Sequence, residues 1–400
     1  MRFSTGRRHV PGSLAGMRVA VVAGPDPGHA FPAIALCTRL RAAGDDPVLF
    51  TGRRWLQPAA DAGLDARLLR GLAPRSFDDD ADAGRRLHER AAYISTELLP
   101  DLAAVAPDLV VSDVLTAGGG LAAERLGVAW VQLSPHPLYA PSIGLPPIGS
   151  GLAVGRGVRG HARDRLLRAL TKPAIRRGRA QRSAARVGVG LPAVDPGPAA
   201  ELIATLPALE VSRPDWPDTA HVVGPLHWEP TAARLPRPPG DGPLVMIAPS
   251  TAHTGAAGML DAALRGLART DVRVVVSMID PPAELPPGVV AGLGRQDELL
   301  PEAAAVICGA GHGLLSKALL AGTPVVAVPG GGDQWELANR AQRQGSALLV
   351  RPPEPDRLRA AVLQVIAEPS FAAAAERAAR GVATVADPVA VCHAATRVPG

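Results

Sequence analysis

One segment, from Cys308 to Asn339, constrains the fold of this chain more than any other. It reads CGAGHGLLSKALLAGTPVVAVPGGGDQWELAN, and an apolar run at 303–308 leads into its glycine-rich turn. The turn opens into a helical stretch, and a second apolar run at 324–329 precedes an Asp-Gln pair. Strand, turn, helix and strand in this order are typical of an open parallel sheet, in which ligands bind outside the carboxyl ends of the strands. The segment therefore predicts an α/β fold with a ligand site in these loops.

The loops of this segment carry groups suited to phosphate and to hydroxyls. Backbone amides that open a helix form an anion site, and here the turn supplies those of Gly309, Ala310, Gly311, His312 and Gly313. Asp333 and Gln334 offer acceptors and donors for hydroxyl groups. A phosphate cradle beside a hydroxyl-binding loop favours a nucleotide-sugar ligand. The structural alternative is an ordinary strand-to-helix turn.

Composition indicates a folded protein without a disulfide framework. The 400 residues fit two doubly wound domains, and 47% hydrophobic with 20% charged residues exclude a disordered chain. Cys37, Cys308 and Cys392 lack CxxC spacing, which argues against disulfides or a zinc site and for a reducing compartment. No apolar run reaches the ~18 residues that span a bilayer, and residues 1–16 lack the apolar core of a signal peptide. We expect a cytoplasmic protein, whose translation starts at Met1 or at Met17.

Short apolar runs alternate with helical lengths in both halves of the chain, which is the pattern of parallel sheets. In the N-terminal half we expect strands at 18–23, 47–51, 108–112 and 129–133, and helices at 32–43, 77–99 and 118–126. After a Pro-rich segment the alternation restarts, with strands at 244–248 and 272–278 around a helix at 255–268. We therefore predict a flexible tail at 1–16, a first domain at 17–211, a linker at 212–242 and a second domain at 243–400, with a cleft between the domains.

The basic charge is concentrated between Arg156 and Arg186. This stretch holds ten Arg and one Lys against a single acidic residue, within a chain of formal charge +5. One interpretation is a pair of solvated helices whose apolar residues face inward, namely Leu166, Leu167, Leu170 and Ile175. The other is contact with a membrane surface or an acidic acceptor. Nucleic acid binding is not indicated, because the stretch has no interleaved aromatic residues.

Polar residues also follow strands in the N-terminal half. His29 lies just before a predicted helix, whose N-terminus favours the neutral imidazole, and Asp113 follows the strand at 108–112. At one sheet edge, Asp113 would fix the tautomer of His29 as a general base. The structural alternative is that each residue merely begins a helix. Ser250 and Thr251 follow a later strand, where they either hold a phosphate or cap a helix.

These motifs resemble those of a known family. GHAFPAIAL near the start, the strand that ends before Asp113, and the pattern GAGHGxxxxALxxGTPVVxVPxxxDQxxxAN are similar to the UDP-glycosyltransferase-like family. In particular they resemble bacterial macrolide and glycopeptide glycosyltransferases, from about Met17 to the C-terminus. The Ala, Arg, Pro and Gly bias resembles that of a GC-rich genome such as an actinobacterial one.

The resemblance implies the GT-B fold, which is α/β with two Rossmann-like domains whose parallel sheets face an interdomain cleft. It also implies a last helix that packs back on the N-terminal domain. The implied enzyme is inverting and metal-independent, and it uses no cofactor. It moves a sugar from a nucleoside diphosphate, UDP or dTDP, to a hydroxyl of a small lipophilic natural product or lipid. His29 matches the catalytic base and Asp113 its orienting acid. The donor would bind to Ser250, Thr251, Gln296, the turn from Gly309 to Leu314, Lys317, Asp333 and Gln334.

Three residues depart from the family pattern at the donor site. Leu293 stands where a tryptophan usually stacks on the base, Gly309 replaces a histidine, and Lys317 replaces a glutamate that holds the ribose. Lys317 could instead meet a phosphate oxygen. These changes motivate an alternative hypothesis, a catalytically silent GT-B protein that binds a ligand or a partner. Such a protein has little use for His29 together with Asp113. The oligomeric state is not indicated by the sequence.

Overall fold

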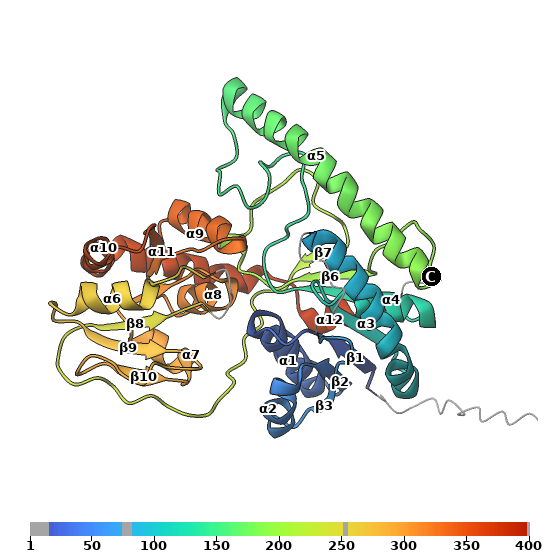
Figure 1. Ribbon diagram of the computed structural model, residues 1–400, viewed down its shortest axis with the longest axis horizontal. Coiled ribbons are helices and arrows are strands. Elements are labelled where there is room, and N and C mark those ends of the chain that lie inside the picture. The colour runs from blue at the N-terminus through green and yellow to red at the C-terminus, as the bar shows by residue number, and fades with distance from the viewer. Residues whose placement is uncertain (1–15, 74–81, 251–254, 398–400) are drawn as a thin grey trace, which may run out of the picture.

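The computed structural model describes residues 16–73, 82–250 and 255–397, so Thr251 and all of the expected tail but Gly16 lie outside the described residues. Within these ranges the N-terminal and C-terminal halves each form a parallel sheet with helices packed against it (Figure 1). The α/β class and the two Rossmann-like units expected from the sequence are confirmed.

The N-terminal sheet has the strand order β3-β2-β1-β4-β5-β6-β7. Its strands are β1 (Arg18–Val22), β2 (Asp46–Thr51), β3 (Asp65–Leu68), β4 (Leu109–Asp113), β5 (Trp130–Ser134), β6 (Ala200–Ile203) and β7 (Ala220–Val222). The helices are α1 (Pro27–Ala42), α2 (Leu56–Asp61), α3 (Ala83–Val105), α4 (Gly118–Leu126) and α5 (Gly157–Gly188). The central strands β1 and β4 are buried apolar runs, as expected where helices cover a parallel sheet. β7 lies inside the segment predicted as a linker at 212–242, where it pairs with β6.

The C-terminal sheet has the strand order β10-β9-β8-β11-β12-β13. Its strands are β8 (Leu244–Ala248), β9 (Arg273–Ser277), β10 (Val290–Gly292), β11 (Ala305–Cys308), β12 (Val325–Ala327) and β13 (Ala347–Leu349). The helices are α6 (Met259–Leu267), α7 (Gln296–Leu299), α8 (His312–Leu320), α9 (Asp333–Gln344), α10 (Pro355–Ala367), α11 (Pro369–Arg380) and α12 (Pro388–Ala395).

The strand orders fix where ligands can bind. In the first sheet the order reverses between β1 and β4, and in the second between β8 and β11. Loops on either side of such a crossover diverge to opposite faces of the sheet and leave a crevice at the carboxyl ends of the strands. The residues at 23–29, 113–116, 249–250 and 309–312 therefore line the two crevices.

The last helix packs on the N-terminal half, although it follows the C-terminal sheet in the chain. Val389, Val391 and Cys392 of α12 share one apolar core with residues of α1 and the first sheet. His393 Nε2 also lies 2.8 Å from Asp45 Oδ2. In Figure 1, α12 lies beside the strands of the first sheet. The last helix of the chain therefore packs against the N-terminal half through this core.

The basic segment is one helix rather than the expected pair. α5 runs through Pro173, and its N-terminal part projects beyond both sheets (Figure 1). The expectation of inward-facing leucines is wrong for Leu166 and Leu170, whose exposed fractions are 61% and 68%. Leu167 and Ile175 are half-buried. The projecting half of the helix has too few neighbours to cover its apolar residues.

Leu166→Gln combined with Leu170→Gln is expected to leave the free energy of unfolding within about 0.5 kcal/mol of the parent, because exposed leucines lose little packing. Leu102→Ala is the control, since that leucine is fully buried in α3 and should cost about 2 to 5 kcal/mol. Urea unfolding measures both values. A loss of more than about 1 kcal/mol in the double variant would mean that these leucines are covered in solution.

Candidate active site

His29 and Asp113 meet at the crossover of the N-terminal sheet. β1 and β4 are parallel neighbours, so the loops that follow them end at the same edge. His29 lies in the first turn of α1, and its Nδ1 is 2.7 Å from Asp113 Oδ2. The other carboxylate oxygen of Asp113 accepts from the backbone N–H of Leu115 at 2.9 Å. Asp113 is buried and the His29 side chain is 17% exposed, so Asp113 orients a ring whose far edge is open to a ligand.

Burial and the nearby carboxylates shift the pKa of His29 in opposite directions. Burial by itself lowers the pKa of His29, but the charge and hydrogen bond of Asp113, together with Asp26 and Asp333, raise it above 6.5. The helix N-terminus was expected to keep the imidazole neutral, and the carboxylates outweigh it. Asp333 belongs to α9 of the C-terminal half, so a carboxylate of that half contributes to the raised pKa of His29.

The glycine turn meets the loop after β8 at the second crossover. A Cβ on Gly309 would lie 3.2 Å from Ser250 Cβ and 3.1 Å from Gln334 Oε1. Gln334 Nε2 donates to Ser250 Oγ at 2.9 Å, and Gln334 Oε1 accepts from the N–H of Gly330 at 3.0 Å. Gln334 is 2% exposed. The Gln334 amide therefore connects the loop after β8 with the loop after β12. Asp333 is half-buried, so it is the residue of the pair whose side chain can reach a ligand.

The turn delivers a helix N-terminus to the crevice. Ala310 adopts a φ of 57°, in the left-handed region, and α8 then begins at His312. First-turn N–H groups such as those of Gly313 and Leu314 are the ones that a helix leaves for a ligand. His312 itself is buried, and its Nε2 lies 2.9 Å from Thr205 Oγ1. Burial lowers the pKa of His312 well below 6.5, so this ring is neutral.

Lys317 and Gln296 form a second cluster with a carboxylate from the segment expected as the linker. Lys317 Nζ donates to Glu229 Oε1 at 2.6 Å and to Gln296 Oε1 at 3.2 Å. Gln296 Nε2 donates to Ser277 Oγ at 3.1 Å. Lys317 is thus paired with Glu229, rather than left for a phosphate oxygen, and the pair places a carboxylate beside Gln296. Glu229 lies in a Pro-rich segment without a motif, so the sequence pattern does not indicate this contact.

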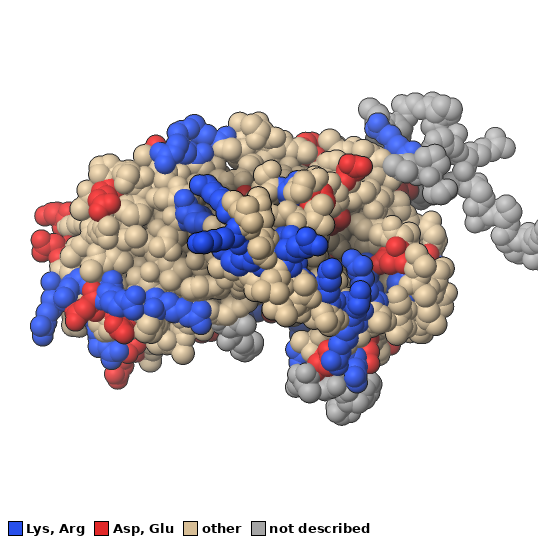
Figure 2. All heavy atoms as spheres, turned by 90° about the horizontal axis from the view of Figure 1, so that it is seen from above, with Lys and Arg blue, Asp and Glu red and all other residues tan. Residues whose placement is uncertain are grey.

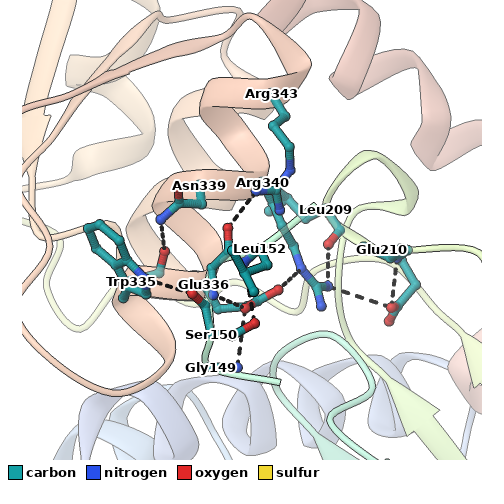
Figure 3. Close-up of polar contacts among 12 residues, drawn as sticks. Gly149, Ser150, Leu152, Leu209, Glu210, Trp335, Glu336, Asn339, Arg340 and Arg343 are labelled. Carbon is teal, nitrogen blue, oxygen red and sulfur yellow. Dashed lines mark hydrogen bonds and ion pairs between the residues drawn. The ribbon is translucent and has the colours of Figure 1, made fainter. Parts of the chain in front are cut away.

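A network on α9 also escaped the sequence analysis. Glu336 accepts backbone N–H groups of Gly149, at 3.2 Å, and Gly151, at 2.9 Å, from the loop between β5 and α5. Arg340 Nε donates to Glu336 Oε1 at 3.0 Å, and Arg340 Nη1 donates to the carbonyl of Leu209 at 2.8 Å. Figure 3 shows the Arg340 guanidinium between Glu336 and Glu210. The helix that carries Asp333 therefore also holds a loop of the N-terminal half.

Two aromatic side chains lie between this network and His29. The His136 and Tyr139 rings stack with centroids 4.4 Å apart and an interplanar angle of 12°. Burial lowers the pKa of His136, and the charge of His29 lowers it further. Burial raises the pKa of Tyr139 well above 10, with the charge of Asp333 adding to the shift. Both residues come from the Pro-rich loop after β5, which the spacing of motifs did not connect with His29.

The described residues contain no candidate metal site and no single helix that could span a membrane. No group of three or more His, Cys, Asp or Glu side chains in these ranges could hold a metal ion. No single helix in the described part of the chain is long and apolar enough to cross a membrane, although the bent pair Pro355–Ala367 and Pro369–Ala395 meets the criterion when taken together.

Comparison with known proteins agrees with this geometry. Residues 249–397 match the family described as erythromycin biosynthesis protein CIII-like, C-terminal domain. The chain is 29% identical to 4'-demethylrebeccamycin synthase of Lentzea aerocolonigenes, over 90% of this chain and 94% of that protein. It is 32% identical to L-demethylnoviosyl transferase of Streptomyces niveus, over 36% of this chain and 38% of that protein.

Solved structures match over nearly the full length. The glycosyltransferase of kitacinnamycin has a TM-score of 0.72 at 20% identity and covers 95% of this chain and 97% of its own. The calicheamicin glycosyltransferase CalG4 has a TM-score of 0.69 at 21% identity, with coverages of 95% and 96%. The fold is therefore the GT-B fold of glycosyltransferases. The chain is an enzyme of the glycosyltransferase class, and its C-terminal half carries the erythromycin CIII-like domain, with relatives among actinobacterial natural-product glycosyltransferases.

Proposed function

We propose that this enzyme transfers a sugar from a nucleoside diphosphate to a hydroxyl of a small lipophilic acceptor, with inversion and without a metal ion. The acceptor would bind to the N-terminal domain, 17–211, and the donor to the C-terminal domain, 243–400. The observation that carries the proposal is the 2.7 Å contact between His29 Nδ1 and Asp113 Oδ2, and the charge of Asp333 from the C-terminal half acts on the same histidine.

The contact at Nδ1 determines what His29 can do. With Nδ1–H donated to Asp113, the lone pair of Nε2 is free to take a proton. As His29 Nε2 removes the acceptor's hydroxyl proton, the oxygen attacks the anomeric carbon. The bond from that carbon to the diphosphate breaks, and the diphosphate leaves with the electron pair. Attack from the face opposite the diphosphate inverts the configuration, and Asp113 stabilises the imidazolium that forms.

The diphosphate would lie at the glycine turn. The N-terminus of α8 supplies amides and a positive dipole end for the charge that develops on the leaving group. Ser250 and Thr251 would add hydroxyl donors, and Asp333 would accept from sugar hydroxyls. Gln296, beside Lys317 and Glu229, would contact the nucleoside. The glycosyltransferase VinC has the same fold, with a TM-score of 0.68 and 21% sequence identity to this chain. Its structure was solved in complex with dTDP, which favours dTDP as the nucleotide here.

A thermal-shift screen tests the donor site. Saturating dTDP is expected to raise the unfolding temperature, because a ligand at 100 times its Kd adds about 2.7 kcal/mol to stability. ADP and GDP should give no comparable shift. Gly309→Val should abolish the dTDP effect, since its side chain would collide with Ser250 and Gln334. Gly188→Val is the control, because a Cβ there meets nothing within 4 Å. Equal shifts from all nucleotides would contradict the assignment of the donor.

Sugar transfer itself is tested with dTDP-glucose and UDP-glucose against a panel of hydroxylated aromatic and macrocyclic acceptors. Release of nucleotide that depends on the acceptor, together with a product of the opposite anomeric configuration, is the expected result. Activity that is retained in excess EDTA would support the metal-independent step. Absence of transfer from any nucleotide-sugar would instead favour the silent binding protein.

A further inference from the structure

A groove of about 890 Å³ lies between α5 and the loop that follows β5. One wall is apolar and includes Ile143, Leu145, Ile148 and neighbouring prolines. The other wall is a stripe of cations on α5, Arg165, Arg168, Lys172, Arg176 and Arg179. The spacing of three or four residues places them on one face of the helix. No acidic residue lines the groove within the described part of the chain. Its volume lies in the range of small-molecule sites.

The cations of this stripe differ from other arginines of α5. Arg163, Arg177, Arg182 and Arg186 each pair with a carboxylate. Among the described residues, the stripe cations have no ion-pair partner, and Arg168 donates to the carbonyl of Leu145 at 2.9 Å. Like charges three or four residues apart destabilise a helix. An unneutralised row of them along a groove therefore indicates an anionic occupant.

The apolar wall is held open by polar contacts. Asp215 accepts from the N–H of Ile143 at 2.8 Å and from Ser142 Oγ at 2.5 Å. Glu336 holds the far end of the loop through the N–H groups of Gly149 and Gly151. Ile143 remains 72% exposed. The loop therefore presents apolar side chains to the groove in a fixed conformation, which lowers the entropic cost of binding a ligand.

Tyr139 connects the groove with the candidate active site. It lines the groove and stacks on His136, and its ring also lies 6.0 Å from the Arg340 guanidinium. The Tyr139 hydroxyl is buried without a hydrogen-bond partner among the described residues. The charge of Asp333 acts on both Tyr139 and His29. Tyr139 therefore borders the groove and, through the stacked His136 ring, the surroundings of His29.

We propose that the groove binds the acceptor, and that the acceptor is an anionic amphiphile. Its apolar body would lie on the loop at 143–148, its anionic group on the stripe from Arg165 to Arg179, and its hydroxyl toward His29. This inference rests on the proposed sugar transfer. A small molecule is favoured over a membrane, because the cations share the groove with the apolar wall formed by the loop at 143–148. In Figure 2, which looks down on the side of α5, basic side chains gather in the middle of the face.

Pyrenebutyrate and its uncharged counterpart pyrenebutanol test the groove by fluorescence titration of the full chain. A triple variant, Arg165→Gln, Lys172→Gln and Arg176→Gln, removes three charges of the stripe. The matched control, Arg53→Gln, Arg159→Gln and Arg269→Gln, removes three exposed charges elsewhere. The triple variant is expected to bind pyrenebutyrate about tenfold more weakly than the control, with pyrenebutanol binding nearly unchanged. Added salt should weaken only the binding of the acid.

Equal affinity of the two triple variants for pyrenebutyrate would overturn the inference. So would binding of phosphatidylglycerol vesicles through the stripe by a chain that does not bind pyrenebutyrate, because that result would make the stripe a membrane contact. The proposed function is tested separately by the nucleotide screen and the transfer assay. Charge-dependent binding of pyrenebutyrate by a chain without transfer would contradict the sugar transfer and leave the assignment of the groove to an anionic ligand supported.

Discussion

His29→Ala is expected to lower turnover by about 10²- to 10⁴-fold, the range that a positioned general base contributes. The affinity for dTDP should stay nearly unchanged, because His29 belongs to the first crevice while the donor is proposed to bind at the second. Discontinuous assays of dTDP release measure the turnover rate, and the thermal shift with dTDP measures the binding of the nucleotide. His161→Ala is the control, since His161 is an exposed histidine on α5. Equal losses of rate and of dTDP binding would make His29 a structural residue.

The pH dependence gives a second test of the same pair. A general base works in its neutral form, so kcat/KM should fall as pH drops through the pKa of His29, which Asp113 helps to raise above 6.5. Asp113→Asn removes the charge while keeping the shape. Burial then dominates and lowers the pKa of His29, so the acidic limb of the profile should move to lower pH as the rate falls. An unmoved limb would show that another group titrates.

The fold could be predicted from the sequence because its signals are local. The strands β1, β4, β8 and β11 are short and consist mostly of buried apolar residues, and glycine-rich turns follow β1 and β11. Parallel pairing then places His29 near Asp113 without further information. Sugar binding by Gln334 stays a prediction, and the sequence motif does not indicate the hydrogen bonds that its amide makes with Ser250 and Gly330.

The rest depends on contacts between segments far apart in the chain. Glu229 pairs with Lys317 across 88 positions of the chain, and Glu336 accepts from Gly151 across 185 positions. The outward position of Leu166 has the same origin, because helical spacing predicts an apolar face but not whether a neighbour covers it. One sequence pattern does indicate such long-range contacts, namely charged residues that follow a ligand-binding motif on the same helix. Glu336 and Arg340 follow Asp333 on α9 in this way.

Glu336→Ala is expected to lower the free energy of unfolding by about 3 kcal/mol, the lower end of the cost of removing one partner of a buried ion pair, because Glu210 still lies 3.7 Å from Arg340 Nη1. Glu336 and Arg340 have side chains that are 6% and 3% exposed, so the guanidinium would lose its nearest carboxylate inside the protein. Two backbone N–H groups, of Gly149 and Gly151, would lose their acceptor as well. Urea unfolding measures the loss, and Gln342→Ala, an exposed truncation on the same helix, should change stability little.

The loss of Glu336 should also affect the conformation of the loop from whose Gly149 and Gly151 N–H groups it accepts hydrogen bonds. Because Glu336 fixes the end of the loop that forms the apolar wall of the groove, its loss should expose 143–152 to limited proteolysis and weaken pyrenebutyrate binding. Glu336→Gln should give an intermediate result, since its amide oxygen can still accept an N–H while the charge that pairs with Arg340 is gone. Unchanged proteolysis in Glu336→Ala would mean that Trp335, which donates to the carbonyl of Ser150 at 3.2 Å, and Arg343, which donates to that of Gly151 at 2.7 Å, hold the loop by themselves.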